Sequence, residues 1–464
     1  MNIKKIHKLA LSILTFSVCF GTIHAKTPNL IVILTDDQGY KDVGFNGCED
    51  IPTPNIDTLA NNGVIFREGY VSFPVCGPSR AGLLTGRYQD RFGYTTNPTI
   101  DPKNEIAGLP KEEENMAEVL TKVGYKSAII GKWHMGSHIS NHPLNRGFDY
   151  FYGFLSGGHN YMPEMLTIQD LSQVTRKWQW YSTKIMENHQ RIEIDDYLTD
   201  ELTDAANRYI DLQVQEDNPF FLYLAYNAPH APLQATEKYL SRFPNIEDKN
   251  RRTYAAMVSS VDDGVGRVLD TLRRNGIEEN TIVVFLSDNG GTTKNSSNND
   301  PLKGFKSDLF EGGIRVPFAM QWKGTIPSAL EFPHPVISLD IMSTITAQTN
   351  VQISKDRPLD GVNLIPYLTG QKSEAPHKTL FWRKRENDGM AIRSGDVKLV
   401  ANTKYKNTEN QLFNIKEDIS EKKNLKSSQP EKSKQLLQEW ENWNAQLKER
   451  YFPTLGKDDW WKKN

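Results

Sequence analysis

The stretch PNLIVIL, residues 28–34, is a continuous apolar run that is rich in β-branched residues. This pattern is typical of a strand buried on both faces of a parallel sheet, because no face is left to carry alternating polar residues. Three similar runs follow at residues 127–130, 220–225 and 281–286. We therefore expect four central strands in one sheet.

Segments with helical periodicity lie between these runs. Helices are expected at residues 55–62, 115–123, 197–212 and 254–274. Strands that alternate with helices predict the α/β class, with a large, mostly parallel sheet sandwiched by helices.

The character of the sequence changes near residue 370. Short runs at residues 380–382, 391–393 and 397–401 predict antiparallel strands, and residues 432–449 have the pattern of an amphipathic helix. We therefore predict a large α/β domain over residues 26–370 and a smaller C-terminal α+β subdomain with an antiparallel sheet over residues 371–464.

The overall charge restricts the partners of the protein. The 464 residues carry a formal net charge of -2, which gives no general attraction to nucleic acid or to an anionic membrane. Neither is expected as a partner, beyond the membrane crossed during export. An anionic substrate must therefore be met by a local group of basic side chains.

Residues 1–25 have the pattern of a secretory signal peptide. A start with three lysines precedes an apolar run over residues 9–20 and a plausible cleavage end at Ala25. The apolar run is shorter than the roughly 20 residues that span a bilayer. The expected location is the periplasm or the exterior, with a lipid anchor on Cys19 as the second interpretation.

Two cysteines, Cys48 and Cys76, remain after the signal peptide, so no disulfide framework is expected. Cys76 opens the run Cys76-Gly77-Pro78-Ser79-Arg80, which reads as the start of a short helix. The amides and the dipole at such a helix start favour an anion and lower the pKa of a thiol. The alternative is a structural cysteine buried ahead of a helix.

Polar residues follow each of the four predicted strands. In parallel sheets the carboxyl ends of the strands meet at one edge, where ligands bind. These residues are therefore expected to lie together: Asp36 and Asp37, Lys132 and His134, His230, and Asp288 and Asn289.

The two acidic pairs suggest a metal site. Hard oxygen ligands are offered by Asp36, Asp37, Asp288 and Asn289. Such ligands favour Ca²⁺ or Mg²⁺ over zinc, and of the two we expect Ca²⁺. Taken singly, each pair is also a common helix cap or turn. Two such pairs at equivalent strand ends favour one shared ion.

The run from Cys76 to Arg80, continued by AGLLTGR over residues 81–87, resembles the signature of the type I sulfatases of the alkaline phosphatase-like superfamily. Further motifs of that family are matched by GKWHMG at residues 131–136, by LKGFKSDLFEGGIRVP at residues 302–317 and by the segment 412–425. The resemblance covers residues 28 to about 430. It resembles in particular the exported bacterial polysaccharide sulfatases.

The resemblance implies a mechanism. In the family, a formylglycine-generating maturase oxidises the cysteine at the position of Cys76 to formylglycine (3-oxoalanine), which joins the four oxygen ligands around Ca²⁺. Lys132 and Lys306 would bind the sulfate, and Arg80 would orient the formylglycine and support the metal carboxylates. His230 would act as general acid and His134 as general base.

The last of these motifs departs from the family at two positions. Phe305 stands where glycine is usual and Lys303 where arginine is usual. The alignment of the motif points to Lys306, and not to Lys303, as the active lysine.

The resemblance and the exported chain together imply a sulfated carbohydrate as substrate, of the ulvan, carrageenan or glycosaminoglycan type. The aromatic stretch KWQWY, residues 177–181, is suited to stacking on a sugar. His159, Arg383 and Arg385 are further candidates for substrate contacts. Two alternatives stay open: a phosphomonoester or phosphonate ester hydrolase of the same fold, and a sulfated-glycan-binding protein without turnover.

Overall fold

The structure, a computed structural model, describes residues 27–384, 389–401 and 409–452. The predicted signal peptide with Cys19, and also Arg385, lie outside the described residues. All four predicted strands are present, with their ends shifted by at most a few residues: β1 (Asn29–Thr35), β4 (Lys126–Lys132), β8 (Phe220–Ala225) and β9 (Thr281–Ser287).

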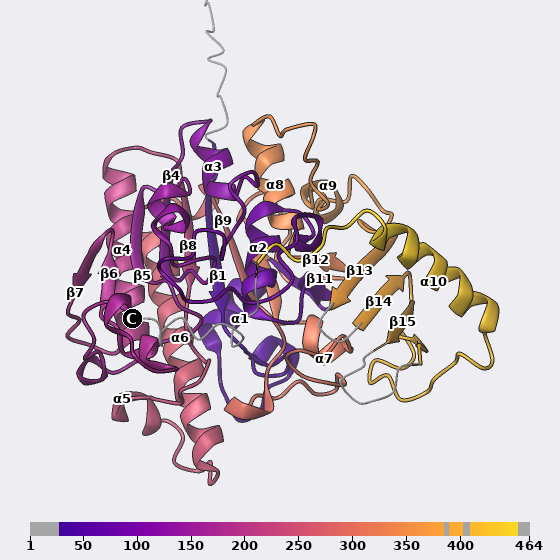
Figure 1. Cartoon of the computed structure of the whole chain (residues 1–464), viewed down its shortest axis with the longest axis horizontal. Coiled ribbons are helices and arrows are strands. Elements are labelled where there is room, and N and C mark those ends of the chain that lie inside the picture. The colour runs from indigo at the N-terminus through magenta and orange to yellow at the C-terminus, as the bar shows by residue number, and fades with distance from the viewer. Residues whose placement is uncertain (1–26, 385–388, 402–408, 453–464) are drawn as a thin grey trace, which may run out of the picture.

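These four strands form the centre of a ten-stranded sheet (Figure 1). The other members are β2 (Val64–Phe66), β5 (Tyr150–Phe154), β6 (Ile185–Glu187), β7 (Gln190–Ile192), β10 (Phe318–Gln321) and β11 (Leu330–Phe332). The order across the sheet is β11-β2-β10-β9-β1-β8-β4-β5-β6-β7.

The centre of the sheet is parallel and its margins are mixed. Strand β1 runs parallel to β8 and β9, and β4 runs parallel to β8 and β5. Strand β10 is antiparallel to β9 and β2, and β6 is antiparallel to β5 and β7. The prediction of a mostly parallel sheet is confirmed.

Side chains of β1 alternate between two apolar layers. Leu30, Val32 and Leu34 face one layer, while Ile31 and Ile33 face the other. All five are at most 1 % exposed, and burial of each such side chain contributes roughly 1.5–3 kcal/mol. Helices cover both layers, as the sequence predicts.

The first layer carries α2 (Cys76–Thr85), α3 (Met116–Thr121), α8 (Asp340–Thr349) and α9 (Ile365–Leu368). The second carries α1 (Pro54–Asn61), α4 (Leu198–Gln215), α5 (Glu237–Leu240) and α6 (Lys249–Arg274). A two-stranded ribbon pairs β3 (Gly69–Tyr70) with β12 (Val336–Ile337).

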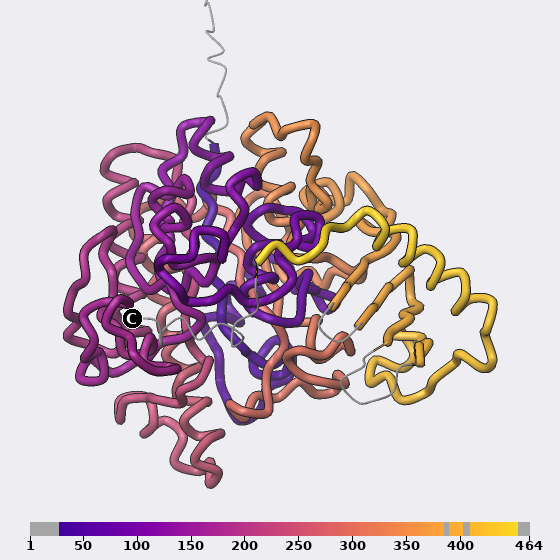
Figure 2. The backbone as a smooth tube through the Cα atoms, in the orientation of Figure 1, coloured from indigo at the N-terminus to yellow at the C-terminus, as the bar shows by residue number. Residues whose placement is uncertain are grey.

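A second, antiparallel sheet contains β13 (Thr379–Lys384), β14 (Gly389–Ser394), β15 (Val397–Ala401) and β16 (Gln411–Asn414) in that order. Helix α10 (Pro430–Asn444) packs on it through Leu436 and Trp443. Both lie beside the large sheet in the trace of the backbone (Figure 2). The predicted sheet is confirmed, and the boundary near residue 370 stays a prediction.

The predicted helix over residues 432–449 ends earlier than expected, at Asn444. Beyond it the chain turns back to the segment that follows α2, where the Lys448 amide donates to the Asp90 carbonyl at 3.0 Å. A tertiary contact therefore overrides a helical sequence pattern.

A buried group of charges joins the second sheet to the short helix α7 (Glu311–Ile314). The Lys398 ammonium lies 2.8 Å from Glu311 Oε1 and 3.0 Å from Glu421 Oε1. Glu421 Oε2 accepts the Glu311 amide at 2.7 Å. We call the junction cluster the following residues: Glu68, Glu311, Glu421, Arg315, Arg393 and Lys398.

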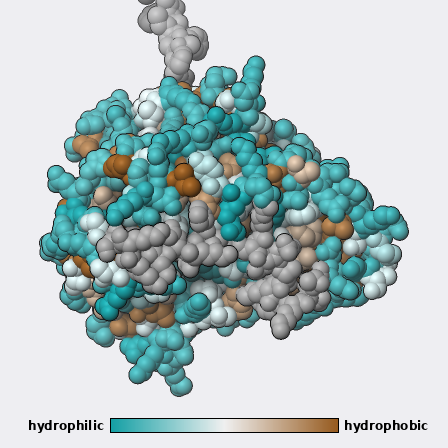
Figure 3. All heavy atoms as spheres, in the orientation of Figure 1, coloured by the Kyte–Doolittle hydropathy of each residue, from teal (hydrophilic) through white to brown (hydrophobic). Residues whose placement is uncertain are grey.

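The surface seen in Figure 3 is mostly hydrophilic, with apolar side chains in separate spots. Among the described residues, every helix is too short or too polar to cross a membrane.

Candidate active site

The register of two strands brings the acidic residues together. Thr35 of β1 pairs with Ser287 of β9, so that the next residues, Asp36 and Asp288, leave the sheet side by side. The Asp288 amide donates to the Thr35 carbonyl at 3.0 Å and extends this pairing by one step.

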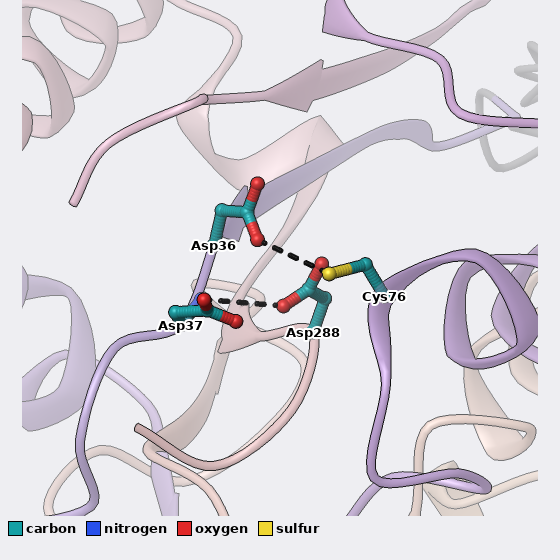
Figure 4. A group of neighbouring side chains, drawn as sticks. All are labelled: Asp36, Asp37, Cys76 and Asp288. Carbon is teal, nitrogen blue, oxygen red and sulfur yellow. Dashed lines mark hydrogen bonds between the residues drawn. The ribbon is translucent and has the colours of Figure 1, made fainter. Parts of the chain in front are cut away.

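Asp37 completes the acidic group with a φ of +61°, which turns its side chain back toward Asp288. Such a backbone conformation is uncommon outside glycine and is concentrated at functional sites. Figure 4 shows Asp36, Asp37, Asp288 and Cys76 converging on one point. One ligand atom from each of the four lies within 4.8 Å of the others.

Cys76 is the first residue of α2 and is 1 % exposed. Its sulfur lies 3.5 Å from Asp36 Oδ1 and accepts a hydrogen bond from the Lys306 ammonium at 3.0 Å. Burial raises the pKa of the thiol to about 12, despite Lys132 and Lys306. The predicted lowering of this pKa is therefore wrong, because burial outweighs the helix start and the two lysines.

Arg80, one turn further along α2, holds the carboxylates in place. Its Nε and its Nη2 atoms lie 2.9 Å and 2.8 Å from Asp288 Oδ2, and Nη2 lies 3.8 Å from Asp36 Oδ2. Its Nη1 donates to the Lys132 carbonyl at 3.1 Å. This fully buried guanidinium thus connects three of the four strand ends.

Two lysines neutralise the acidic group from opposite sides. Lys132 at the end of β4 lies 2.5 Å from Asp36 Oδ2, and Lys306 lies 2.6 Å from Asp37 Oδ1. Lys303 points elsewhere, with its ammonium 3.9 Å from the centre of the Phe310 ring. The structure therefore places Lys306, and not Lys303, beside Cys76.

A glycine allows Lys132 to reach this position. Gly131 has a φ of +111°, and a methyl group on its Cα would lie 1.9 Å from the Ala225 carbonyl of the neighbouring strand. Only glycine tolerates both the conformation and the contact.

The charges shift the acidity of the carboxylates in opposite directions. Burial alone would raise the pKa of Asp37, but Lys306 and His230 outweigh it and lower the pKa to about 2. Burial and the neighbouring Asp36 raise the pKa of Asp288 to about 6, against the effect of Arg80. Of the two, Asp288 is thus the carboxylate whose charged form is less stabilised, and a bound cation would lower its pKa.

Asn289 supplies direct support for a metal ion. Its Nδ2 donates to Asp37 Oδ1 at 2.7 Å, which aims the amide oxygen away from that bond. Asn289 Oδ1 is buried and has no hydrogen-bond partner among the described residues. A buried oxygen without a partner, beside three carboxylates, fits a hard cation such as Ca²⁺ or Mg²⁺.

His134 lies on the loop after β4 with a φ of +56° and is 2 % exposed. Neither ring nitrogen has a hydrogen-bond partner among the described residues. Burial and the cations Lys132 and Arg80 lower its pKa well below the ordinary value, so the ring is neutral. A methyl group on Gly157 would lie 2.5 Å from Nε2, so a glycine leaves room for the ring.

His230 faces the acidic group from the loop after β8. Its Nε2 lies 3.7 Å from Asp37 Oδ2, and Nδ1 lies 2.6 Å from the Ala231 carbonyl. Burial, together with Lys132 and Lys306, lowers its pKa to about 3, although Asp37 acts in the opposite direction. Its side chain is 15 % exposed, which leaves one edge open to an incoming ligand.

The structure places two of the predicted substrate contacts in the interior of the protein. His159 is fully buried, its ring centre lies 4.7 Å from that of Phe154, and Nδ1 lies 3.0 Å from the Asn160 carbonyl. Arg383 is also buried, and it donates to Asp90 Oδ1 at 2.9 Å. Their part in substrate binding stays a prediction. Arg385 lies outside the described residues.

Tyr181, which belongs to the aromatic stretch already predicted to stack on a sugar, lies close to Gly158. The structure also adds Asn295, which the sequence did not single out. Asn295 donates from Nδ2 to the carbonyls of Asp37 and Pro229, at 3.1 Å and 3.2 Å, and so ties two loops of the site together. Its surroundings in the sequence, a polar loop, carry no signal that distinguishes it.

The described site thus combines a metal-binding acidic group, a residue at a helix start, two lysines and two neutral histidines. Such an arrangement can hold a tetrahedral anion between a cation and two ammonium groups, and it offers two bases for proton transfer. The fold and the site define an ester hydrolase of the alkaline phosphatase-like fold.

Comparison with known proteins identifies the family. The sulfatase family model matches residues 28–351. The chain therefore belongs to the sulfatase family, and it is a sulfuric ester hydrolase.

Two relatives and one solved structure illustrate this similarity. The uncharacterized sulfatase YdeN of Escherichia coli (strain K12) is 34 % identical over 408 residues, which cover 76 % of this chain and 68 % of YdeN. The N-acetylgalactosamine-6-sulfatase of Mus musculus is 35 % identical, with 80 % and 71 % covered. The crystal structure of Ps i-CgsB in complex with k-i-k-neocarrahexaose has a TM-score of 0.87 and 39 % identity, and covers 93 % of this chain and 96 % of that chain.

Proposed function

We propose that this sulfatase removes sulfate from a sulfated carbohydrate, using a formylglycine made from Cys76 and a bound Ca²⁺. The observation that carries the proposal is the position of Cys76. Its sulfur lies 3.0 Å from the Lys306 ammonium, and it shares a 4.8 Å cluster with Asp36, Asp37 and Asp288. The sulfur marks the place of the formylglycine oxygens.

The thiol itself is poorly suited to attack an ester. Burial holds its pKa at about 12, so the fraction present as thiolate at neutral pH is very small. The hydrate of formylglycine instead supplies one hydroxyl to attack sulfur and a second to release the sulfate. The oxidation must come from a separate maturase that recognises the motif from Cys76 to Arg80 and brings its own oxidant.

Residues of the chain would hold the proposed cation and the sulfate. Asp36, Asp37, Asp288 and Asn289 provide the oxygen ligands for Ca²⁺, which would neutralise charge on the sulfate. The ammonium groups of Lys132 and Lys306 bind the remaining sulfate oxygens, and both are already fixed by their carboxylate partners. Fixed charges of this kind stabilise a transition state without reorganisation.

The two histidines are proposed to move the protons. His134 is neutral, and neither of its ring nitrogens is bonded to another described residue. A base that accepts a proton from a formylglycine hydroxyl requires such a ring. His230 has its exposed edge toward the acidic group, and a bound anion raises the pKa of such a ring. His230 is therefore proposed to protonate the departing sugar oxygen.

The substrate class is proposed from the relatives. The mouse relative is named for N-acetylgalactosamine 6-sulfate, and the structure of Ps i-CgsB holds a neocarrahexaose. A carbohydrate sulfate of the carrageenan or glycosaminoglycan type is accordingly preferred over ulvan. The pattern of residues 1–25 supports export to the periplasm or beyond, where such polymers are met.

The test is sulfate release from a panel of carrageenan, glycosaminoglycan and ulvan oligosaccharides, by the protein co-produced with a formylglycine-generating maturase. We expect release from at least one member, and a loss of at least about a thousandfold in Cys76→Ala. Arg80→Lys is the matched variant, because it keeps Cys76 but removes the two-pronged contact with Asp288. It is expected to lose activity to a lesser degree.

Two results would contradict the proposal. Hydrolysis of phosphate esters in place of sulfate esters would favour the phosphohydrolase alternative. Tight binding of a sulfated glycan without any release, by the matured protein, would favour the binding protein.

A further inference from the structure

The loop over residues 171–182 carries an exposed tryptophan whose backbone is strained. Trp178 is 51 % exposed and has a φ of +71°. This conformation is rare for a bulky side chain, and residues that are held in it are concentrated at functional sites. The strain calls for an explanation beyond the packing of the loop.

Contacts within residues 171–182 hold the backbone of Trp178 in this conformation. Trp180 is buried with Leu171 and Val174, and the Gln179 side chain accepts the amides of Thr175 and Arg176 at 2.9 Å and 3.1 Å. The ring of Trp178 is thereby held at the surface.

The same loop reaches the active site through Tyr181. A methyl group on Gly158 would lie 2.5 Å from Tyr181 Oη and 3.1 Å from His230 Cε1, so the phenol lies next to the proposed general acid. Burial raises the pKa of Tyr181 above its ordinary value, while the nearby Lys306 lowers it and Asp36 raises it by smaller amounts.

Tyr181 and Trp178 together form an aromatic path from the active site toward the solvent. The ring centres of Tyr181 and Trp178 are 5.7 Å apart, a distance comparable to one sugar unit of a glycan. Tyr181 is partly buried, and Trp178 is exposed. The path thus runs from the reacting centre to the solvent.

Two cationic residues directly precede Trp178 in the sequence. The Lys177 ammonium lies 5.0 Å from the centre of the Trp178 ring, and Arg176, the preceding residue in the chain, is also exposed. In the described parts of the chain, no carboxylate lies within ion-pair distance of either residue. Their charges are therefore available to an anionic ligand.

We propose that residues 176–181 form a second sugar subsite, an inference that rests on the proposed function. Trp178 would stack on the sugar next to the one that loses its sulfate, and Lys177 and Arg176 would contact a sulfate on that neighbouring sugar. The ligand class is a sulfated oligosaccharide of at least two units. A single sulfated sugar would leave this subsite empty.

The experiment compares the oligosaccharide cleaved best in the panel above with 4-nitrophenyl sulfate, which is too small to reach Trp178. In Trp178→Gly, we expect the ratio of kcat/KM between the two substrates to fall about tenfold, mainly through KM. Glycine suits a positive φ, so this variant should unfold at the same or a higher temperature than the parent. Lys177→Ala should lower the ratio about threefold, and less at high salt.

A matched control is available at a distance from the loop. Lys372 lies 5.1 Å from the ring centre of Tyr367 beside α9, a similar cation and aromatic pair. Tyr367→Ala should leave the ratio unchanged.

The outcomes separate the subsite from the proposed function. An unchanged ratio in a stably folded Trp178→Gly overturns the subsite alone, and so does an equal loss with both substrates. If the parent releases sulfate from neither substrate, the proposed function fails. The subsite is then tested by titrating a neocarrahexaose against tryptophan fluorescence, where about tenfold weaker binding in Trp178→Gly supports it and equal binding overturns it.

Discussion

The active site and the junction cluster contain the same kinds of charged side chain. Each gathers three carboxylates and three cations, and five of the six are buried in each region. In the active site these are Asp36, Asp37, Asp288, Arg80, Lys132 and Lys306. In the junction cluster they are Glu68, Glu311, Glu421, Arg315, Arg393 and Lys398.

The two regions differ in what is left unpaired. In the junction cluster, Glu421 Oε1 accepts no hydrogen bond among the described residues, yet it lies 3.0 Å from the Lys398 ammonium. In the active site, Asn289 Oδ1 and both nitrogens of His134 are buried with neither a hydrogen bond nor an opposite charge described beside them. The buried charges of the junction cluster thus have partners among the described residues, whereas the active site leaves buried polar atoms without one.

This difference shows how a functional site can be recognised among buried charges. A buried polar atom without a partner costs about 1–3 kcal/mol, so several such atoms gathered beside buried carboxylates point to a ligand that completes the set. The junction cluster is expected to govern stability, and the active site to govern activity at some cost in stability.

The largest effect is expected at Lys306. Lys306→Ala removes an ammonium group from Cys76 and Asp37 and should lower kcat/KM at least about a hundredfold. Lys303→Ala is the matched control, because Lys303 belongs to the same loop but packs on Phe310. Sulfate release should fall less than about threefold in the control. Equal losses in both variants would contradict the assignment of Lys306.

The next effect concerns the junction cluster. Lys398→Met leaves Glu311 and Glu421 buried without their shared cation and should lower the free energy of unfolding by about 3–5 kcal/mol in urea denaturation. Arg274→Met breaks an exposed pair with Asp211 and should cost less than about 1 kcal/mol. A small loss in Lys398→Met would show that the cluster does not fix the second sheet.

Asn289 should behave in the opposite way. Asn289→Ala removes an oxygen that has no partner within the described protein, together with one donor to Asp37, so activity should fall about tenfold or more while the free energy of unfolding falls by about 1–2 kcal/mol, less than in Lys398→Met. Excess Ca²⁺ should restore part of the activity, and a chelator should abolish activity in the parent reversibly. Loss of stability without loss of Ca²⁺ affinity would assign Asn289 to the structure alone.

The smallest effect is a pH dependence at His377, which lies 2.8 Å from Asp340 Oδ1. Burial alone would lower the pKa of His377, but Asp340 outweighs it and raises the pKa above the unfolded value. The pair therefore stabilises the protein fully below a pH of about 6.5, and this contribution is lost as the pH rises through the folded pKa. His377→Gln should destabilise the protein more at pH 6 than at pH 9 in urea denaturation. The reverse order would contradict the pairing.

The sequence predicted the centre of the fold better than its margins. Strands β1, β8 and β9 are continuous apolar runs, because both of their faces are buried. Strands β6 and β10 were not predicted, since three or four residues show no period and their position depends on pairing with distant strands.

The same holds for the candidate site. Residues directly after the strands were predicted, because the register of β1 and β9 carries Asp36 and Asp288 to one point. The raised pKa of Cys76, the burial of His159 and the internal ion pair of Arg383 depend on packing from several segments. No local pattern encodes them.

The most direct test of the central claim is the mass of the tryptic peptide that contains Cys76, from protein co-produced with a formylglycine-generating maturase. We expect a loss of about 18 Da, the change from a thiol to an aldehyde, in step with sulfate release. A peptide with an unmodified cysteine, from a preparation that nevertheless releases sulfate at full rate, would contradict it.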